Sequence, residues 1–263
     1  MSEDEIILTH ILKCRRIDLL VDKPTLTVPQ HKQFHEYKAR RLKGEPLQYI
    51  LGCWEFYGLM FKVDPRVLVP RPETEILVDL AIRNFKSKDI LDLGTGSGNI
   101  AITLAKFLPH AQIVTVDISQ YALVLAKDNA HQHGVEERVE FVHTDIGEYC
   151  RTSACSFDLI ISNPPYVPSG QMNQLPIDVR QEPAIALDGG SDGLDFYRTI
   201  IKYSPRLLRT GACLMMESGD GQAEAIGALF KTQPLFLNIE IHKDLAGKDR
   251  IIIAGGFDGK ICH

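Results

Sequence analysis

The sequence predicts an α/β protein. A small helical domain and a β-hairpin linker precede a doubly wound, mostly parallel sheet of seven strands with helices on both faces. From residue 89 onward, short β-prone stretches alternate with helical ones, which is the pattern of a parallel sheet. The first stretch runs into a glycine-rich loop at 94–98, and the fourth stops at N-P-P-Y, residues 163–166. Because such sheets bind ligands at the carboxyl ends of their strands, both features predict a site there.

Length and composition fit a globular protein with one large and one small domain. Of its 263 residues, 44 % are hydrophobic and 24 % are charged, which are ordinary values. No run approaches the roughly 20 apolar residues of a membrane span, and the acidic start, M-S-E-D-E, argues against a secretory signal. The six cysteines include no C-x-x-C pair, which favours free thiols. We therefore expect a cytoplasmic protein.

Charge is unevenly distributed along the chain. Residues 1–88 contain 15 Lys and Arg against 12 Asp and Glu, whereas the remainder contains 14 against 22. An acidic second part argues against strong non-specific binding to nucleic acid. His131 and His133 are two positions apart and would not share a helix face, so no metal site is predicted.

The amino-terminal part predicts two small units. Residues 1–52 are expected to form a helical domain, with amphipathic helices over about 6–12 and 30–43. The basic residues of the second helix face either a partner or solvent. Residues 53–72 mix aromatic and β-branched residues with turn residues, which predicts a β-hairpin linker. The remainder, 73–263, is the expected α/β domain.

The α/β domain begins with a helix over 75–85, whose start Thr74 and the acidic residues around it can support. Seven strands are predicted after it, near 90–93, 113–116, 139–142, 157–161, 212–216, 235–241 and 250–254. Helices are predicted between them, from the glycine loop to 107 and over 119–133, 194–208 and 221–230. This order is typical of a doubly wound sheet.

Three successive strand ends carry groups that suit a nucleoside. The loop G-T-G-S-G (Gly94, Thr95, Gly96, Ser97 and Gly98) lets backbone approach a ligand closely, since glycine lacks a Cβ. Asp117, at the end of the next strand, can accept hydrogen bonds from two ribose hydroxyls. Asp145 and Ile146 follow the third strand and offer an acceptor and an apolar surface to an adenine ring. The loop matches neither G-x-G-x-x-G nor a P-loop, so a dinucleotide and a phosphate cradle are both disfavoured.

The fourth strand ends in Asn163, Pro164, Pro165 and Tyr166. Two prolines cannot continue a sheet ladder because each lacks the backbone N–H, and they stiffen the chain at this point. An amide, rigid carbonyls and an aromatic ring therefore lie together beside the expected cofactor. A plain strand-ending turn is the alternative interpretation.

These motifs carry a family resemblance. L-D-L-G-T-G-S-G, V-D, T-D and N-P-P-Y resemble the S-adenosyl-L-methionine-dependent methyltransferases that act on nitrogen. Further blocks are similar to the release-factor glutamine methyltransferases, namely G-E-P-L-Q-Y-I-L-G (44–52), E-F-Y-G-L (55–59), V-P-R-P-E-T-E (69–75), E-P-A-I-A-L-D-G-G-S-D-G-L-D-F-Y-R (182–198) and K-D-L-A-G-K-D-R (243–250). The resemblance covers nearly the whole chain. It differs in a shorter amino-terminal region and in Ser218-Gly219 after Glu217.

The resemblance implies a Rossmann-like class I methyltransferase fold and a reaction. The substrate would be the glutamine of the Gly-Gly-Gln motif in class I peptide-chain release factors, and the product cofactor would be S-adenosyl-L-homocysteine. Asn163 and the Pro164 carbonyl would accept hydrogen bonds from the glutamine NH₂, with Pro165 and Tyr166 beside it. The cofactor would contact the loop 94–98, Asp117, Asp145, Ile146 and Asn163. The amino-terminal region would bind the release factor.

Two other classes of function remain open. A DNA adenine amino-methyltransferase faces the same planar NH₂ group, but it also needs a basic cleft in which to bind and flip a base. A non-catalytic, cofactor-dependent binding module would keep the cofactor site without turnover. A methyl-transfer assay distinguishes this module from an enzyme.

Overall fold

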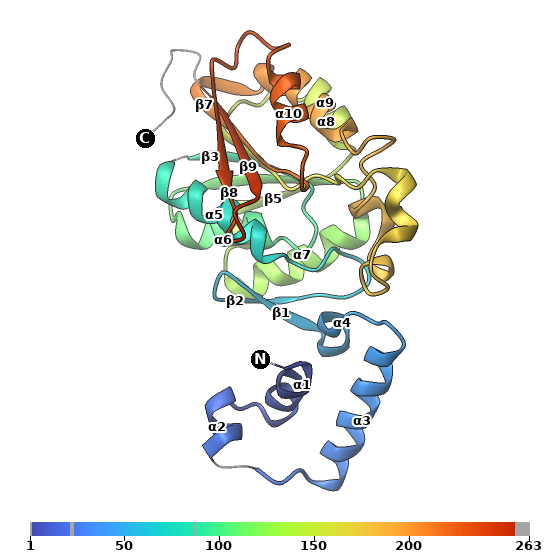
Figure 1. Ribbon diagram of the computed structural model, residues 1–263. Coiled ribbons are helices and arrows are strands. Elements are labelled where there is room, and N and C mark those ends of the chain that lie inside the picture. Colours follow the sequence, from blue (N-terminus) through green and yellow to red (C-terminus); the bar gives the residue numbers. More distant parts are fainter. Residues whose placement is uncertain (1, 22–23, 87, 256–263) are drawn as a thin grey trace.

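A computed structural model describes residues 2–21, 24–86 and 88–255 (Figure 1). Four helices form the amino-terminal region: α1 (Glu3–Leu12), α2 (Arg16–Val21), α3 (Val28–Leu42) and α4 (Leu47–Leu51). A two-stranded antiparallel hairpin follows, β1 (Cys53–Phe56) and β2 (Leu59–Lys62). In Figure 1 these helices lie beyond the hairpin, away from the main sheet.

The main sheet has seven strands in the order β5-β4-β3-β6-β7-β9-β8. The strands are β3 (Asp89–Leu93), β4 (Gln112–Asp117), β5 (Val139–His143), β6 (Phe157–Ser162), β7 (Leu208–Glu217), β8 (Asn238–Lys243) and β9 (Asp249–Gly255). The first five pair in parallel, and β9 pairs antiparallel with both β7 and β8. The chain leaves β3 for β4 and β5, then crosses to β6 on the other side. This reversal beside β3 is where open α/β sheets bind ligands.

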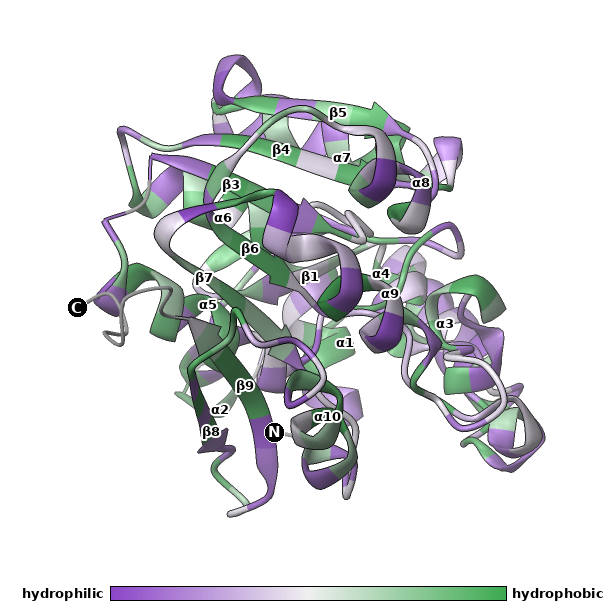
Figure 2. Cartoon of the chain, turned by 90° about the horizontal axis from the view of Figure 1, so that it is seen from above, coloured by the Kyte–Doolittle hydropathy of each residue, from purple (hydrophilic) through white to green (hydrophobic). Residues whose placement is uncertain are grey.

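Helices cover both faces of this sheet. They are α5 (Pro72–Asn84), α6 (Asn99–Phe107), α7 (Gln120–His133), α8 (Ile146–Thr152), α9 (Asp195–Tyr203) and α10 (Ala223–Phe230). Successive strand residues point to opposite faces: Ile90 packs with α5, α6 and α7, while Leu91 packs with α8, α9 and α10. In Figure 2 much of β6, β7 and β9 has the green colour of hydrophobic residues, as expected for strands buried on both faces. The predicted fold class is confirmed.

The amino-terminal helices begin where their sequences supply caps. Ser2 accepts a hydrogen bond from the Glu5 N–H, and the Glu5 carboxylate accepts one from the Ser2 N–H, so part of the acidic start is a capping box. Helix α3 starts at Val28, two residues before the predicted start, because Pro29 is tolerated in a first turn. Helices α2, α4 and α8 are short and were not predicted.

Helix α4 and the hairpin pack on the α/β body. Phe56 and Phe61 are buried with the helices of one sheet face, and the Asn129 Oδ1 of α7 accepts a hydrogen bond from the Lys62 N–H. The Tyr49 hydroxyl of α4 donates to the Val67 carbonyl. The segment from α4 to α5 therefore forms one wall of the body.

Within the described residues, every helix is too short or too polar to cross a bilayer. Four of the predicted free thiols are observed, at Cys14, Cys53, Cys150 and Cys155, whereas Cys262 lies outside the described residues.

Candidate functional site

The glycine loop turns sharply between β3 and α6. Gly94 and Thr95 donate backbone hydrogen bonds to the Val116 carbonyl, which ties the start of the loop to β4. Gly98 has a φ of +81°, and a Cβ there would lie 2.6 Å from the Ile102 Cδ1 atom. The left-handed backbone conformation therefore favours glycine at this position, and a Cβ would also force the end of the Ile102 side chain to shift.

Asp117, at the carboxyl end of β4, holds this loop in place. Its Oδ2 atom accepts a hydrogen bond from the Gly96 N–H at 2.9 Å, and its Oδ1 atom accepts one from the Ser119 N–H at 2.8 Å. Burial raises the pKa of the Asp117 carboxyl, and these backbone N–H groups oppose the rise. Two donors occupy only part of the capacity of a carboxylate, so Asp117 retains lone pairs for a ligand.

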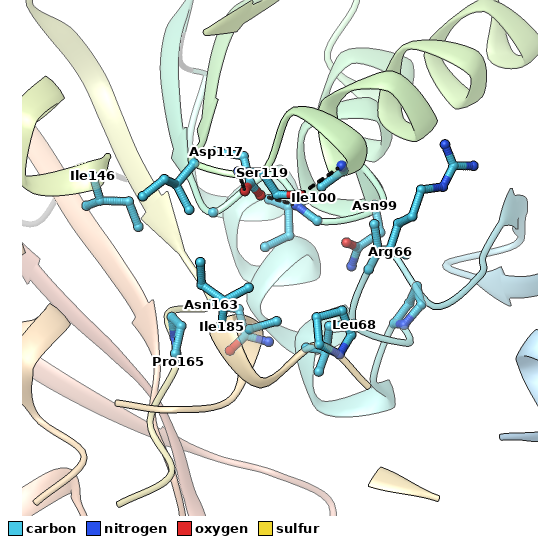
Figure 3. Close-up of a pocket in the computed structure, with 18 of the residues that line it drawn as sticks. Arg66, Leu68, Asn99, Ile100, Asp117, Ser119, Ile146, Asn163, Pro165 and Ile185 are labelled. Atoms are coloured by element: carbon cyan, nitrogen blue, oxygen red, sulfur yellow. Dashed lines mark hydrogen bonds between the residues drawn. The ribbon is translucent and has the colours of Figure 1, made fainter. Parts of the chain in front are cut away.

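A cavity opens in front of the loop, and we call it the glycine-loop cavity (Figure 3). Its lining includes seven predicted site residues: Gly94, Gly96, Asp117, Asp145, Ile146, Asn163 and Pro165. Asp117, Ile146 and Asn163 approach it from the ends of three different strands (Figure 3). Further lining residues were not predicted, among them Arg66, Leu68, Asn99, Ile100, Ser119, Ala122, Ile185 and Phe196.

Thr95, Ser97 and Gly98 do not line this cavity. Thr95 is buried, and its hydroxyl pairs with the Thr115 hydroxyl at 2.8 Å. Ser97 is also buried, and its carbonyl accepts a hydrogen bond from Asn129 Nδ2. In this structure the three residues shape the loop, and their contact with a cofactor stays a prediction.

Asp145 also serves the fold. It is the N-cap of α8, and its Oδ1 atom accepts a hydrogen bond from the Glu148 N–H at 3.0 Å. The helix that it caps brings Ile146 to the cavity wall.

A second cavity lies on the other side of Asn163, and we call it the Tyr166 cavity. Its lining includes Asn163, Pro164 and Tyr166, as well as Arg71, Glu73, Glu217 and Arg250. The two cavities share Leu68, Arg71, Asn163 and Ala186. The structure therefore places the N-P-P-Y segment between a space beside the glycine loop and a space lined by charged groups.

Two acceptors of this segment have no partner among the residues that the structure describes. The Asn163 side chain donates from Nδ2 to the Thr74 hydroxyl at 3.0 Å, and its Oδ1 atom accepts no hydrogen bond from the described protein. The Pro164 carbonyl oxygen likewise accepts none. Both oxygens are thus free to bind a ligand that donates N–H groups.

The loop after N-P-P-Y packs tightly beneath it. A Cβ at Gly189 would lie 2.8 Å from the Pro165 carbonyl oxygen, and one at Gly193 would lie 2.3 Å from the Tyr166 carbonyl oxygen. That Tyr166 oxygen accepts a hydrogen bond from Gln222 Nε2 at 2.9 Å. The glycines of the block 182–198 therefore let backbone approach the N-P-P-Y segment closely.

Glu182 fixes the segment that precedes α5. Its side chain accepts a hydrogen bond from the Val69 N–H at 3.0 Å and another from the Arg71 guanidinium at 2.6 Å. Burial raises the pKa of the Glu182 carboxyl, while Arg71 opposes the rise. The contact brings two blocks of the sequence, 69–75 and 182–198, together at the cavity.

Thr74 does not have the role predicted from sequence. Helix α5 starts at Pro72 with Arg71 as its N-cap, and Thr74 is buried inside the first turn, 1 % exposed. Its hydroxyl donates to Glu217 Oε2 at 2.6 Å. Glu217 ends β7 and is also 1 % exposed. Both residues belong to the environment of Asn163, and the only sequence indication of Thr74 was its position in the V-P-R-P-E-T-E block.

Two family models match the chain. The "PrmC N-terminal domain" matches residues 2–52, and the "Methyltransferase small domain" matches residues 72–178. The chain is also similar to "Release factor glutamine methyltransferase" from Geobacter sulfurreducens, with 45 % identity over 95 % of this chain and 87 % of the relative. The protein of that name from Moorella thermoacetica is 42 % identical over 84 % of this chain and 79 % of the relative.

Solved structures support the fold. A methyltransferase from Pyrococcus furiosus aligns with a TM-score of 0.59 at 17 % identity, covering 84 % of this chain and 98 % of that one. The catalytic domain of hMettl16, solved in complex with an RNA hairpin, aligns with a TM-score of 0.63 at 16 % identity, covering 90 % of this chain and 94 % of that one. Sequence identity this low shows the Rossmann-like methyltransferase fold alone. The curated relatives decide the family: this chain belongs to the release factor glutamine methyltransferases.

Proposed function

We propose that this protein transfers a methyl group from S-adenosyl-L-methionine to the side-chain amide nitrogen of the glutamine in the Gly-Gly-Gln motif of class I peptide-chain release factors. One observation carries the proposal. Asn163, which lines both cavities, and Pro164, which lines the Tyr166 cavity, each offer an oxygen, Asn163 Oδ1 and the Pro164 carbonyl, with no hydrogen-bond partner among the described residues. A primary amide presents two N–H donors, which matches this pair. S-Adenosyl-L-homocysteine would be the second product.

The glycine-loop cavity fits a nucleoside cofactor. Asp117 retains lone pairs for ribose hydroxyls, and Asp145 and Ile146 offer an acceptor and an apolar wall to an adenine ring. Backbone at Gly94 and Gly96 lines the cavity without a side chain in the way. S-Adenosyl-L-methionine supplies an electrophilic methyl group when it is bound there.

The reaction needs an amide nitrogen that is oriented for attack and a positive charge on nitrogen that is stabilised, and residues of this protein would meet both needs. An amide nitrogen is a poor nucleophile because its lone pair is delocalised into the carbonyl group. Acceptors at Asn163 and Pro164 orient both N–H bonds and stabilise the positive charge that develops on nitrogen. One N–H proton is lost to solvent as the N–C bond forms. Burial raises the pKa of Tyr166 to about 12, so its phenol stays neutral and can pack on the planar amide.

Recognition of the intact release factor is assigned to the amino-terminal region. Helix α2 exposes Ile17, Leu20 and Val21, which are 52 %, 56 % and 70 % accessible. An apolar surface of this kind is suited to a protein partner. We propose that residues 1–52 and the linker 53–72 dock the factor, that residues 73–263 do the chemistry, and that both act in the cytoplasm, where translation ends.

The test is methyl transfer in a purified system. The protein is incubated with S-adenosyl-L-methionine and a class I release factor, and the factor is then digested and analysed by mass spectrometry. A single added methyl group on the Gly-Gly-Gln glutamine is expected, and none on a factor whose glutamine is replaced by alanine. Transfer to an adenine-containing DNA duplex instead would refute the proposal, as would cofactor binding without transfer to any substrate.

A further inference from the structure

The side chains of Glu217, Thr74 and Asn163 form a continuous hydrogen-bonded chain behind the N-P-P-Y segment. The Thr74 hydroxyl donates to Glu217 Oε2 at 2.6 Å, and Asn163 Nδ2 donates to the Thr74 Oγ1 atom at 3.0 Å. Glu217 and Thr74 are both 1 % exposed; Thr74 lies at the wall of the glycine-loop cavity, Glu217 at the wall of the Tyr166 cavity, and Asn163 lines both. The chain therefore runs from a buried acid to the amide that the proposed mechanism uses.

The direction of this chain follows from the chemistry of its ends. An ionised carboxylate only accepts hydrogen bonds, so the single hydroxyl hydrogen of Thr74 must point to Glu217. The Thr74 oxygen is then left with lone pairs alone on the side of Asn163. The atom of Asn163 that faces it must be a donor, so Nδ2 occupies that position and Oδ1 takes the other.

We propose that Glu217 and Thr74 are positioning residues that fix the Asn163 amide with its oxygen toward the substrate NH₂ group. The inference rests on the proposed function, because it assigns a use to the orientation of Asn163. If Glu217 were protonated, it could donate to Thr74, and Thr74 could then donate to Asn163 Oδ1. The amide would turn over and present an NH₂ group to an NH₂ group, which cannot form the required hydrogen bonds.

The surroundings of Glu217 make the orientation of the Asn163 amide depend on pH. The charged and titratable groups that face Glu217 are Arg71, Glu73, Tyr166, Tyr197 and Arg250. Burial raises the pKa of the Glu217 carboxyl to about 7, while the hydrogen bond from Thr74 and the charge of Arg250 oppose the rise. Glu217 is therefore ionised above that pH and protonated below it. The methyl-transfer rate should rise with pH across this range.

The activity test compares variants that change only this chain. Thr74→Val keeps the shape of the side chain and removes the hydroxyl, so single-turnover methyl transfer to the release factor should slow about tenfold or more. Thr74→Ser restores the hydroxyl and should restore the rate. Glu217→Gln can both donate and accept, so it should slow transfer and flatten the pH dependence. Because Thr74 also lines the glycine-loop cavity, the rates are measured at saturating S-adenosyl-L-methionine, where a change in cofactor affinity does not alter the single-turnover rate.

Thr103→Val is the matched control. Thr103 is buried in α6, and its hydroxyl has no hydrogen-bond partner among the described residues. The same substitution there should leave the rate and its pH profile unchanged. A wild-type rate in Thr74→Val, or equal losses in Thr74→Val and Thr74→Ser, would overturn the inference.

A second measurement does not depend on activity. The ¹⁵N-bound side-chain amide protons of Asn163, assigned by their loss in Asn163→Ala, should shift with pH around the titration of Glu217. In Thr74→Val this shift should vanish. The inference about the Glu217–Thr74–Asn163 hydrogen bonds would be disproved if the Asn163 signals did not change with pH in the wild type, or if they titrated identically in Thr74→Val. If the wild type methylates no release factor, the proposed function fails. The titration still decides whether Glu217 and Thr74 orient the Asn163 amide.

Discussion

The contribution of Asp117 to cofactor affinity and to the stability of the fold can be estimated from its hydrogen bonds. Its two oxygens accept from the N–H groups of Gly96 and Ser119, and its remaining lone pairs are available to two ribose hydroxyls. We expect Asp117→Ala to remove the ligand contacts and the support of the loop together. Hydrogen bonds to charged groups contribute about 1.5–3 kcal/mol each in favourable cases.

The number of hydrogen bonds lost in Asp117→Ala gives the expected change in cofactor affinity and in the free energy of unfolding. Loss of the ribose contacts should weaken S-adenosyl-L-methionine binding by ~1–3 kcal/mol, which is roughly 5–150-fold in the dissociation constant. Leaving the two backbone N–H groups without an acceptor should also lower the free energy of unfolding of the unliganded protein, by ~2–4 kcal/mol. Asp117→Asn keeps one acceptor oxygen and should show smaller losses of both kinds.

Isothermal titration calorimetry measures the affinity, and chemical denaturation measures the stability. Asp158→Ala is the matched control. Asp158 also accepts two backbone N–H hydrogen bonds, from Lys88 and Asp89 at 3.0 Å each, and it also pairs with Arg209. It lies near the amino end of β6, at the opposite edge of the sheet from Asp117. The control should therefore lose stability and keep its affinity for the cofactor.

The comparison separates binding from folding. If Asp117→Ala binds S-adenosyl-L-methionine with wild-type affinity, Asp117 does not contact the cofactor. If Asp158→Ala loses as much affinity as Asp117→Ala, the loss reflects general destabilisation, and the assignment of Asp117 to the ribose is refuted.

Three further predictions use other measurements. Asn163→Ala should lower kcat for methyl transfer roughly 10²-fold because it removes an oriented acceptor, and Asn163→Asp should retain more activity; wild-type single-turnover rates for Asn163→Ala would exclude the mechanism. Burial raises the pKa of Asp92 to about 7. Ionisation of Asp92 therefore lowers the stability of the fold as pH rises from the pKa of the unfolded state toward 7. Asp92→Asn should stabilise the protein about 2 kcal/mol more at about pH 8 than at about pH 5. Denaturation at both pH values tests this, and an equal gain would contradict it. Replacing Ile17, Leu20 and Val21 of α2 with serine should slow methylation of the intact release factor and spare a Gly-Gly-Gln peptide; equal effects on both would remove α2 from recognition.

The main features of the site could be predicted because parallel strands bring their carboxyl ends together. A glycine loop, Asp117 and Asn163 each follow a strand in the sequence, and the sheet geometry then places them at one edge. The alternation of strand and helix stretches was sufficient to predict a doubly wound, mostly parallel sheet, whereas the Rossmann-like methyltransferase fold was implied by the family resemblance.

Other features depend on contacts that periodicity does not encode. Helix α8 is only seven residues long, too short to give a clear helical pattern. The roles of Thr74 and Glu217 come from a contact between residues 143 positions apart, and Glu182 contacts Arg71 across 111 positions. Such pairs are visible only once the sheet order is known. Resemblance to a family marked the blocks that contain them without assigning their contacts.

The position of β9 has a consequence for the biosynthesis of the protein. The strand β9 comes last in the described chain, yet it pairs between β7 and β8, and its Arg250 donates to the Ser218 carbonyl next to Glu217. Contacts between distant parts of a sequence form slowly because they close long loops. A nascent chain can form β3 to β6 and the glycine loop early, but β7 remains an open sheet edge until β9 has been synthesised. The part of the site around Glu217 is thus completed last. A chain that stops before β9 should lack an ordered Glu217 even when the strands and the loop around the glycine-loop cavity have folded.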